Sequence, residues 1–238
     1  MNKYCSKKLI VSVCLFALIL LISACSGSNN RGRESLVDNS GSIEYFYTLP
    51  DTEPGYKFKT PAFKGVLGIP PLDTDSLRGD RRMLFKLSAR PLEIRLHHFR
   101  FWTDSPTKLV QQKISIYLRD IQFASKVIRF VPGTKVDYLM HASLIKFERL
   151  VNIKSSSDEV LVSIELSISK ESTGQIVVPA TIYHIRQKAV RARSANDTIS
   201  NAVKSFKIAL DKALLQFVQQ HAAKQFSQRI KIKPTKKK

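Results

Sequence analysis

The stretch VLVSIELSI at Val160–Ile168 is the clearest fold signal in this chain, because apolar and mostly polar residues alternate along it. A period of two places the apolar side chains on one side of a strand, so the stretch predicts a half-buried β-strand. Thr173-Gly174 predicts a turn after it, and Ile176–Val190 then predicts a partner strand. Pro179 lacks an N–H, which predicts that this partner is an edge strand or contains a bulge.

Strand signals continue toward the N-terminus. A turn is predicted at Ser155–Asp158, and before it Tyr138–Leu150 predicts a long strand, which completes a three-strand meander. Further strands are predicted, in chain order, at Ile43–Leu49, Phe63–Ile69, Met83–Ala89, Glu93–Trp102 and Val127–Val131. The stretch Asp51–Pro61 contains proline and glycine and is predicted to be a loop.

Two amphipathic helices are predicted to cover these strands. Ser105 is the predicted cap of the first and Pro106 suits its first position, and its apolar residues recur at helical spacing: Val110, Ile114, Tyr117 and Ile121. Asn196 or Asp197 is the predicted cap of the second, whose apolar face consists of Ile199, Val203, Phe206, Leu210, Leu214 and Phe217. This order of elements predicts an α/β fold with a mixed sheet, as one domain over residues 43–222.

Residues 1–24 have the layout of a secretory signal. Lysines stand near the start, the apolar run Leu9–Ile22 follows, and Ser23-Ala24 are small. The apolar run is shorter than the ~20 residues that span a bilayer. Because Ile22–Cys25 also matches a bacterial lipobox, Cys25 is predicted to carry the acyl groups of a lipoprotein. A plain signal peptide and an uncleaved anchor are the alternatives.

The remaining cysteines, Cys5 and Cys14, lie inside the predicted signal, so no disulfide is expected in the folded part. Residues 25–42 are polar and rich in Ser, Gly and Asn, which predicts a flexible tether after the lipidated cysteine. Residues 223–238 are basic and lose the helical period, which predicts a disordered cationic tail.

The formal net charge is +20. In a cytosolic protein such a charge would first suggest nucleic acid, but the predicted export argues against that partner, and the aromatic residues do not alternate with basic ones as stacking platforms would. Anionic lipid headgroups, lipopolysaccharide or an acidic protein surface remain as partners. A solvated basic surface without any electrostatic role is the alternative.

Little in the chain suggests catalysis. No His-Glu-x-x-His, Gly-x-Ser-x-Gly or phosphate-loop motif occurs. The adjacent His97 and His98 point to opposite faces of a strand and cannot share a metal. His141 and His184 fall on strands that could be neighbours, but structural roles suit them better. We therefore expect no enzyme activity, no cofactor and no metal.

Two groups of residues are candidate binding sites. Tyr45 and Tyr47 are predicted to contact a protein partner, since tyrosine is enriched at interfaces, although a core strand with one exposed ring is the alternative. Four basic residues are the predicted anion or lipid-headgroup site, with a solvated surface as the alternative: Arg186, Lys188, Arg191 and Arg193.

Several segments occur in order along the chain: the lipobox at Cys25, Tyr45-Phe46-Tyr47-Thr48-Leu49-Pro50, Gly65-Val66-Leu67-Gly68-Ile69-Pro70, Arg100-Phe101-Trp102, and a strand from Asp137-Tyr138 to Phe147-Glu148. With the closing amphipathic helix, this ordered set resembles the ABC-type transport auxiliary lipoproteins, of the paraquat-inducible intermembrane-transport type. The chain departs from that family at Thr103-Asp104-Ser105-Pro106, where a Pro-Leu segment is usual, and in its basic body and tail.

The resemblance implies a three-layer α/β/α domain with a mixed sheet and no catalysis. It implies an accessory role in a mammalian-cell-entry-type (MCE) ABC transporter, which moves phospholipids between the two envelope membranes. The partners would be the MCE-type periplasmic substrate-binding protein with its permease and ATPase. The lipoprotein would be anchored in the outer membrane and face the periplasm, and Ser26 fits outer-membrane sorting.

Two alternatives stay open: a periplasmic carrier of lipid or lipopolysaccharide, and a structural lipoprotein of an envelope complex. Assembly into a homo-oligomer would leave no mark in one sequence.

Overall fold

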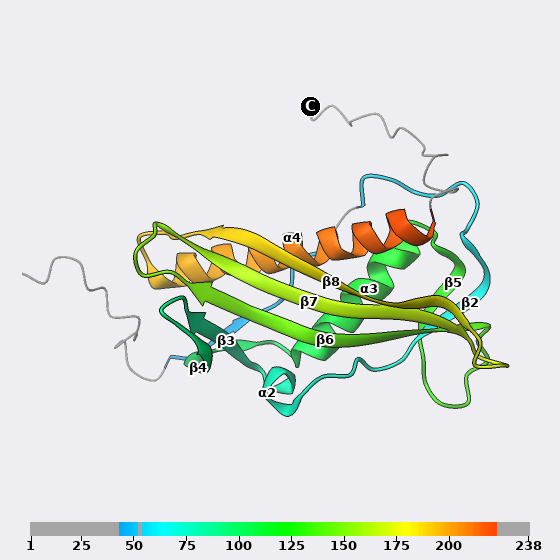
Figure 1. Ribbon diagram of the computed structural model, residues 1–238, viewed down its shortest axis with the longest axis horizontal. Helices are drawn as coiled ribbons and strands as arrows, with labels where there is room; N and C mark the ends of the chain where they lie inside the picture. Colours follow the sequence, from blue (N-terminus) through cyan, green and yellow to red (C-terminus); the bar gives the residue numbers. More distant parts are fainter. Residues whose placement is uncertain (1–42, 52–53, 223–238) are drawn as a thin grey trace, which may run out of the picture. The chain divides into compact units, whose positions relative to one another are not determined.

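The computed structural model describes residues 43–51 and 54–222. The predicted signal at 1–24, the predicted tether at 25–42 and the predicted tail at 223–238 lie outside the described residues. The described part contains an eight-stranded mixed sheet and three helices around one hydrophobic core (Figure 1). The α/β class predicted from the order of elements is confirmed.

The predicted meander forms the longest strands of the sheet. β6 (Tyr138–Val151), β7 (Ser157–Lys170) and β8 (Ile176–Val190) pair antiparallel in chain order. The even-numbered residues of β7 from Val160 to Ile168 are all buried, as their alternation predicts. The pairing of β7 with β8 shifts register on both sides of the Ile168–Val178 pair, beside Pro179, and β8 is an edge strand, so both expectations from this proline are met.

The other side of β6 holds two separate groups of strands. Near the start of β6, β2 (Phe63–Ile69) pairs with it in parallel, and β5 (Ala124–Arg129) lies beyond β2. Near its end, β3 (Arg82–Leu87) pairs in parallel. β4 (Arg90–Trp102) then runs antiparallel to β3, and β1 (Tyr45–Tyr47) is parallel to β4. The short helix α2 (Ser76–Gly79) connects the two groups.

Several strand boundaries differ from their predictions for physical reasons. β1 is shorter than Ile43–Leu49, because it pairs with β4 at three residues and Leu49 enters the core. Pro91 lies inside β4 rather than before it. This position is tolerated because the strand is exposed there.

Two long helices complete the fold, α3 (Pro106–Asp120) and α4 (Ala195–His221). Ser105 precedes α3 as predicted, although its side chain makes no capping hydrogen bond. The prediction of Asn196 or Asp197 as the cap of α4 is wrong. Ser194 is the cap: its Oγ accepts a hydrogen bond from the Asp197 N–H and donates one to the Asp197 carboxylate.

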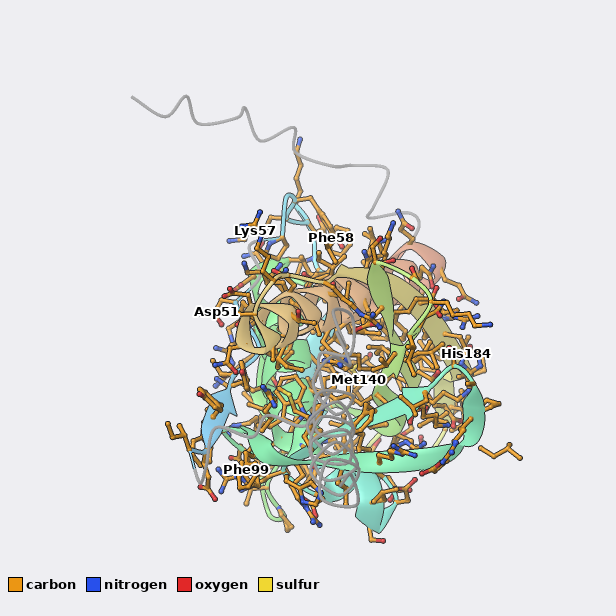
Figure 2. All side chains as sticks on the ribbon, turned by 90° about the vertical axis from the view of Figure 1, so that its left-hand side faces the viewer. Asp51, Lys57, Phe58, Phe99, Met140 and His184 are labelled. Carbon is orange, nitrogen blue, oxygen red and sulfur yellow. The ribbon has the colours of Figure 1, made fainter. Side chains whose placement is uncertain are left out.

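Both long helices lie on one face of the sheet. α4 contacts β7 and β8, and Lys113 of α3 lies 3.9 Å from Asp211 of α4. The whole predicted apolar face of α4 is buried. The opposite face of the sheet carries exposed side chains on β8, and the short helix α2 lies on that face at β6, where Arg78 reaches Glu148. Figure 2 places Met140 inside the molecule and His184 at its surface.

Candidate functional site

The aromatic strand β1 lies at one edge of the sheet. Tyr45 and Tyr47, the predicted partner-binding residues, are half-buried on the face that carries the helices, opposite Arg100 and Trp102. Phe46 between them points the other way, stacks on Phe101 at 5.6 Å between ring centroids, and remains 52% exposed. In this strand the ring most available to a partner is therefore Phe46. The roles of the two tyrosines stay predictions.

The four basic residues of the predicted anion site do not gather on one surface. Arg186 and Lys188 are exposed on the face of β8 away from the helices, where Arg186 pairs with Glu159 at 3.0 Å. Arg191 lies past the end of β8 and reaches the opposite, helix-covered face. Arg193 is exposed before α4. The headgroup role of this group stays a prediction.

A different set of side chains, most of them charged and buried, lies near the first turn of α4. We refer to Arg100, Arg149, Asp158, Arg191 and His97 as the charged cluster. Arg149 on β6 and Asp158 on β7 are 5% and 1% exposed. Phe147 lies two positions before Arg149, Val160 lies two positions after Asp158, and both are core residues. Strand alternation therefore places Arg149 and Asp158 on the helix-covered face. In Figure 1, α4 begins beside the end of β6, close to β3 and β4.

Asp158 is the centre of the ion pairs in this cluster. Arg191 donates to Asp158 Oδ1 from Nε at 2.9 Å and from Nη2 at 2.5 Å. Arg191 also donates to the carbonyl oxygens of Ser155 and Asn152, so it holds the turn between β6 and β7. Arg149 reaches the second oxygen, with Nε 3.4 Å from Oδ2. One carboxylate is thus shared by two guanidinium groups.

Arg100 on β4 extends the positive charge toward the helix. Its Nη2 donates to Asn196 Oδ1 in the first turn of α4 at 3.1 Å, and its guanidinium lies over the Tyr45 ring at 5.8 Å. Arg100 is 4% exposed. The cluster therefore continues from β7 through β6 to β4 and the aromatic edge strand.

His97 is the neutral member of the cluster. Burial, followed by the positive charges of Arg149 and Arg100, lowers the pKa of its imidazole to about 3. Its ring lies 4.6 Å from the ring of Phe85, the residue of β3 that is opposite Arg149 in register. The Nε2 atom of His97 is buried without a hydrogen-bond partner among the described residues.

A second buried charge lies on the other face of the same strands. Glu148 is fully buried and pairs with Lys86 Nζ at 3.0 Å and with Arg78 Nη2 at 3.2 Å. Arg78 comes from α2, so this pairing fixes the short helix against β6 and β3. Here the cations come from two elements that the carboxylate holds together, which is a structural role.

Two further histidines, His141 and His184, make contacts within the sheet. His141 and His184 do not lie on neighbouring strands, because β7 separates β6 from β8. They pair with β7 serines instead: His141 Nε2 lies 3.1 Å from Ser169 Oγ, and His184 Nδ1 lies 2.7 Å from Ser163 Oγ. In the described ranges, no group of three or more His, Cys, Asp or Glu side chains is arranged to hold a metal ion.

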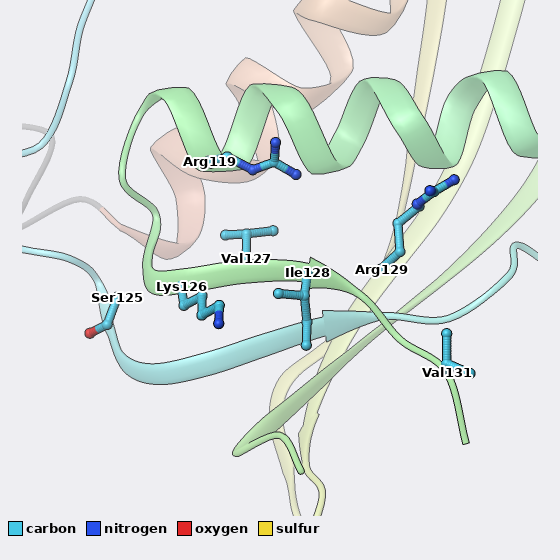
Figure 3. A pocket seen from close by; sticks show the side chains of 7 residues that line it. All are labelled: Arg119, Ser125, Lys126, Val127, Ile128, Arg129 and Val131. Atoms are coloured by element: carbon cyan, nitrogen blue, oxygen red, sulfur yellow. The ribbon is translucent and has the colours of Figure 1, made fainter. Parts of the chain in front are cut away.

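An open hollow of about 640 Å³ lies along the edge strand β5, near the end of α3 (Figure 3). Its lining is apolar and basic, with Arg119, Lys126 and Arg129 around Val127 and Ile128. This hollow lies at a sheet edge and does not enter the core between the sheet and α4.

None of the helices that the structure describes is long and apolar enough to cross a membrane.

The sequence analysis assigns no binding role to Arg149, Asp158 or Arg100. Asp158 falls in a predicted turn, and Arg149 and Arg100 fall in predicted strands. One signal was present: the alternation Val160, Val162, Ile164 extends backward to Asp158, which puts a carboxylate in line with core residues.

No family model and no curated protein matches this sequence. Solved structures resemble its fold. A crystal structure of a Xanthomonas campestris protein described as DUF330 matches with a TM-score of 0.60 at 15% identity, covering 77% of this chain and 99% of that one. A second, uncharacterised protein matches with a TM-score of 0.51 at 9% identity, covering 74% of this chain and 99% of its own. The described part of the chain therefore shares its fold with these two proteins.

Proposed function

We propose that the protein is a bacterial envelope lipoprotein, anchored to the outer membrane by acyl groups on Cys25 and facing the periplasm. The observation that carries this proposal is the lipobox Ile22–Cys25, which directly follows a positive start and a short apolar run. Several acyl chains at about 0.8 kcal/mol per buried CH₂ hold a protein to a membrane far more firmly than the single chain that gives marginal binding.

We propose further that the folded part is an adaptor subunit of an MCE-type ABC transport system for intermembrane phospholipid trafficking and envelope integrity. It would dock the periplasmic substrate-binding protein, which works with its permease and ATPase. An adaptor needs contact surfaces rather than a reaction centre, so the proposal includes no catalysis and no cofactor. A flexible tether raises the effective concentration of a docking domain to roughly millimolar, so weak contacts suffice.

The packing of α4 favours an adaptor over a lipid carrier. A carrier needs an apolar cavity between the sheet and this helix, with part of the helix face left uncovered. The residues of that face are instead at most 5% exposed, from Ile199 at one end to Phe217 at the other. Rings fill the space beneath it, with Phe147 and Phe206 only 4.4 Å apart between centroids.

The anchor is tested with a Cys25→Ala variant of the full chain. Wild type is expected to incorporate radiolabelled palmitate and to sediment with outer-membrane vesicles. The variant is expected to incorporate none and to leave the outer-membrane fraction. Its interaction with the transporter proteins should weaken in cells but persist between purified proteins mixed at high concentration. A Cys25→Ala chain that remains in the outer membrane and supports envelope integrity would contradict the anchoring proposal.

Lipid analysis of the purified protein separates the adaptor from the carrier. The full chain is extracted in detergent, freed of exchangeable lipid, and analysed by mass spectrometry for lipid that stays bound in stoichiometric amounts. We expect no apolar cargo beyond the covalent acyl groups. Recovery of one phospholipid or lipopolysaccharide per chain, removed by enlarging residues at the α4–sheet contact, would favour the carrier.

A further inference from the structure

Arg149 is a buried cation whose hydrogen-bonding capacity is largely unused. Its side chain is 5% exposed, and its Nε and Nη1 atoms are buried with no hydrogen-bond acceptor among the described residues. Its ionic contact among the described residues is the 3.4 Å approach of Nε to Asp158 Oδ2. Since a guanidinium stays protonated in proteins, a buried arginine with free donors is costly unless another acceptor is supplied.

Asp158 does not balance the charge around Arg149. Its Oδ1 atom already accepts two bonds from Arg191, and the Asn152 N–H donates to the same oxygen at 3.3 Å. Within the described ranges, Asp158 is the one carboxylate that pairs with either arginine. One negative charge therefore serves two guanidinium groups.

The unused donors lie on one face of neighbouring strands. Arg149 on β6 is opposite Phe85 on β3, and the Phe85 ring is in contact with the His97 ring of β4. His97 has a buried Nε2 without a partner, and its imidazole is neutral at physiological pH, so it can offer an N–H without adding charge. Phe85 and His97 are partly exposed and Arg191 is 26% exposed, which leaves a route from solvent.

We propose that the charged cluster is a binding site for an oxyanion of the phosphate class, with Arg149 Nη1 and His97 Nε2 as its central donors. An N–H of a guanidinium donates a strong, charge-assisted hydrogen bond to a phosphate oxygen. A phosphate also brings the negative charge that Asp158 alone cannot supply. The N-terminus of α4 is not the basis of the site, because Ser194 and Asp197 already cap it.

The phosphate has two possible sources with the same chemistry, a phospholipid headgroup or free inorganic phosphate. The site differs from the predicted headgroup residues, because Arg186 and Lys188 lie on the opposite face of the sheet. It goes beyond the proposed adaptor function and does not depend on it. A lipoprotein with another partner could have the same site.

The test is thermal unfolding of the full chain, purified in an uncharged detergent, with added sodium phosphate or with sodium chloride at matched ionic strength. Wild type is expected to unfold at a higher temperature in phosphate, in a saturable manner. The Arg149→Met variant keeps Asp158 paired with Arg191, so it should fold with unchanged or higher stability in chloride. Its phosphate affinity should be weaker by roughly tenfold or more, the effect expected for a lost charge-assisted hydrogen bond.

Two further variants make the result specific. Arg149→Lys keeps the charge but loses the planar guanidinium group, so it should fold and bind phosphate more weakly than wild type. This variant replaces Arg149→Met if Arg149→Met does not fold. Arg186→Ala is the control on the other face and should respond to phosphate like wild type. Equal responses of wild type to phosphate and chloride would overturn the proposal, as would wild-type phosphate affinity in both Arg149 variants.

Dihexanoyl-phosphatidylglycerol, added below its micelle concentration, identifies the source of the phosphate. If the site takes a lipid headgroup, this lipid should stabilise wild type at least as well as inorganic phosphate and should fail with Arg149→Met. If the site takes free phosphate, inorganic phosphate should stabilise wild type and the lipid should not.

Discussion

Two regions beneath α4 differ sharply although the same strands build both. Under the middle of the helix, Trp102 and Phe147 pack with Phe206 to form an aromatic core. Under its first turn, the next residues on the same face are Arg149 and Asp158. On β6, the charged Arg149 lies two positions after the core residue Phe147. On β7, the charged Asp158 lies two positions before the core residue Val160.

The contrast shows where the stability of this fold arises. In the core, every buried ring removes apolar surface from water and has partners on all sides. In the charged cluster, Arg149 loses its hydration and Arg191 loses part of it, and the two share one carboxylate, so their burial is only partly compensated. The first region holds the fold together, and the second is the region that a ligand can complete.

The largest effect is expected in the core. Phe206→Ala removes a ring that is 4% exposed and touches both Trp102 and Phe147, so it should lower the free energy of unfolding by about 3–5 kcal/mol. Denaturant unfolding measures this loss. Ile208→Ala on the same helix is the control, since Ile208 is 40% exposed, and it should cost less than about 1 kcal/mol. Equal losses would mean that α4 does not pack as described.

The charged cluster should respond unevenly to removal of its members. Asp158→Asn leaves two cations without a counter-charge, and we expect a loss of about 3 kcal/mol, at the lower end for a broken buried pair because Arg191 is partly exposed. Arg149→Met in phosphate-free buffer should instead leave the free energy of unfolding unchanged or higher. If the two variants were destabilised equally, Arg149 would be a structural partner of Asp158 rather than a surplus cation.

The pH dependence of stability should report on His97. Its pKa is about 3 in the folded protein and near 6.5 when unfolded, so the unfolded chain binds more protons between these values. The contribution of His97 to stability is therefore complete above pH 6.5 and is lost as the pH falls toward 3. Unfolding experiments between pH 7 and 4 should show a steeper loss for wild type than for His97→Asn. Parallel curves would show that His97 is accessible to protons in the folded state.

The smallest effect is expected on the open face of the sheet. Arg186 and Glu159 form an ion pair at 3.0 Å, but their side chains are 64% and 43% exposed. Water and salt screen such a pair, so Arg186→Ala should change the free energy of unfolding by less than about 1 kcal/mol. A larger loss in denaturant titration would mean that this face is covered by something the described residues do not include.

The sequence predicted the local elements better than their arrangement. The bounds of β8 and the apolar face of α4 follow from periodicity, which nearby residues determine. The attachment of both β2 and β3 to one side of β6 depends on contacts between distant segments, for which Leu67 or Leu84 gives no local sign. The predicted cap of α4 was two or three residues too late, because Ser194, Asn196 and Asp197 are all good capping residues.

The charged cluster could not be predicted for the same reason. Arg149 looks like a surface residue of a strand, and Asp158 looks like a turn residue. Their burial depends on α4 beginning above them, which only the tertiary structure shows. The orientation of Tyr45 and Tyr47 also depends on contacts between distant segments, because the parallel pairing with β4 determines that Phe46 is the exposed ring of β1.

The proposed adaptor function is tested most directly by affinity purification of the tagged full chain from crosslinked cell envelopes, followed by mass spectrometry. If the protein is an adaptor, an MCE-type periplasmic protein should be recovered with it, together with the permease and ATPase. A photo-crosslinking residue at the exposed Phe46 should capture the periplasmic protein, and one at Ile182 on the far edge strand serves for comparison. Recovery of lipid alone, or of envelope proteins without any transporter component, would contradict the adaptor function.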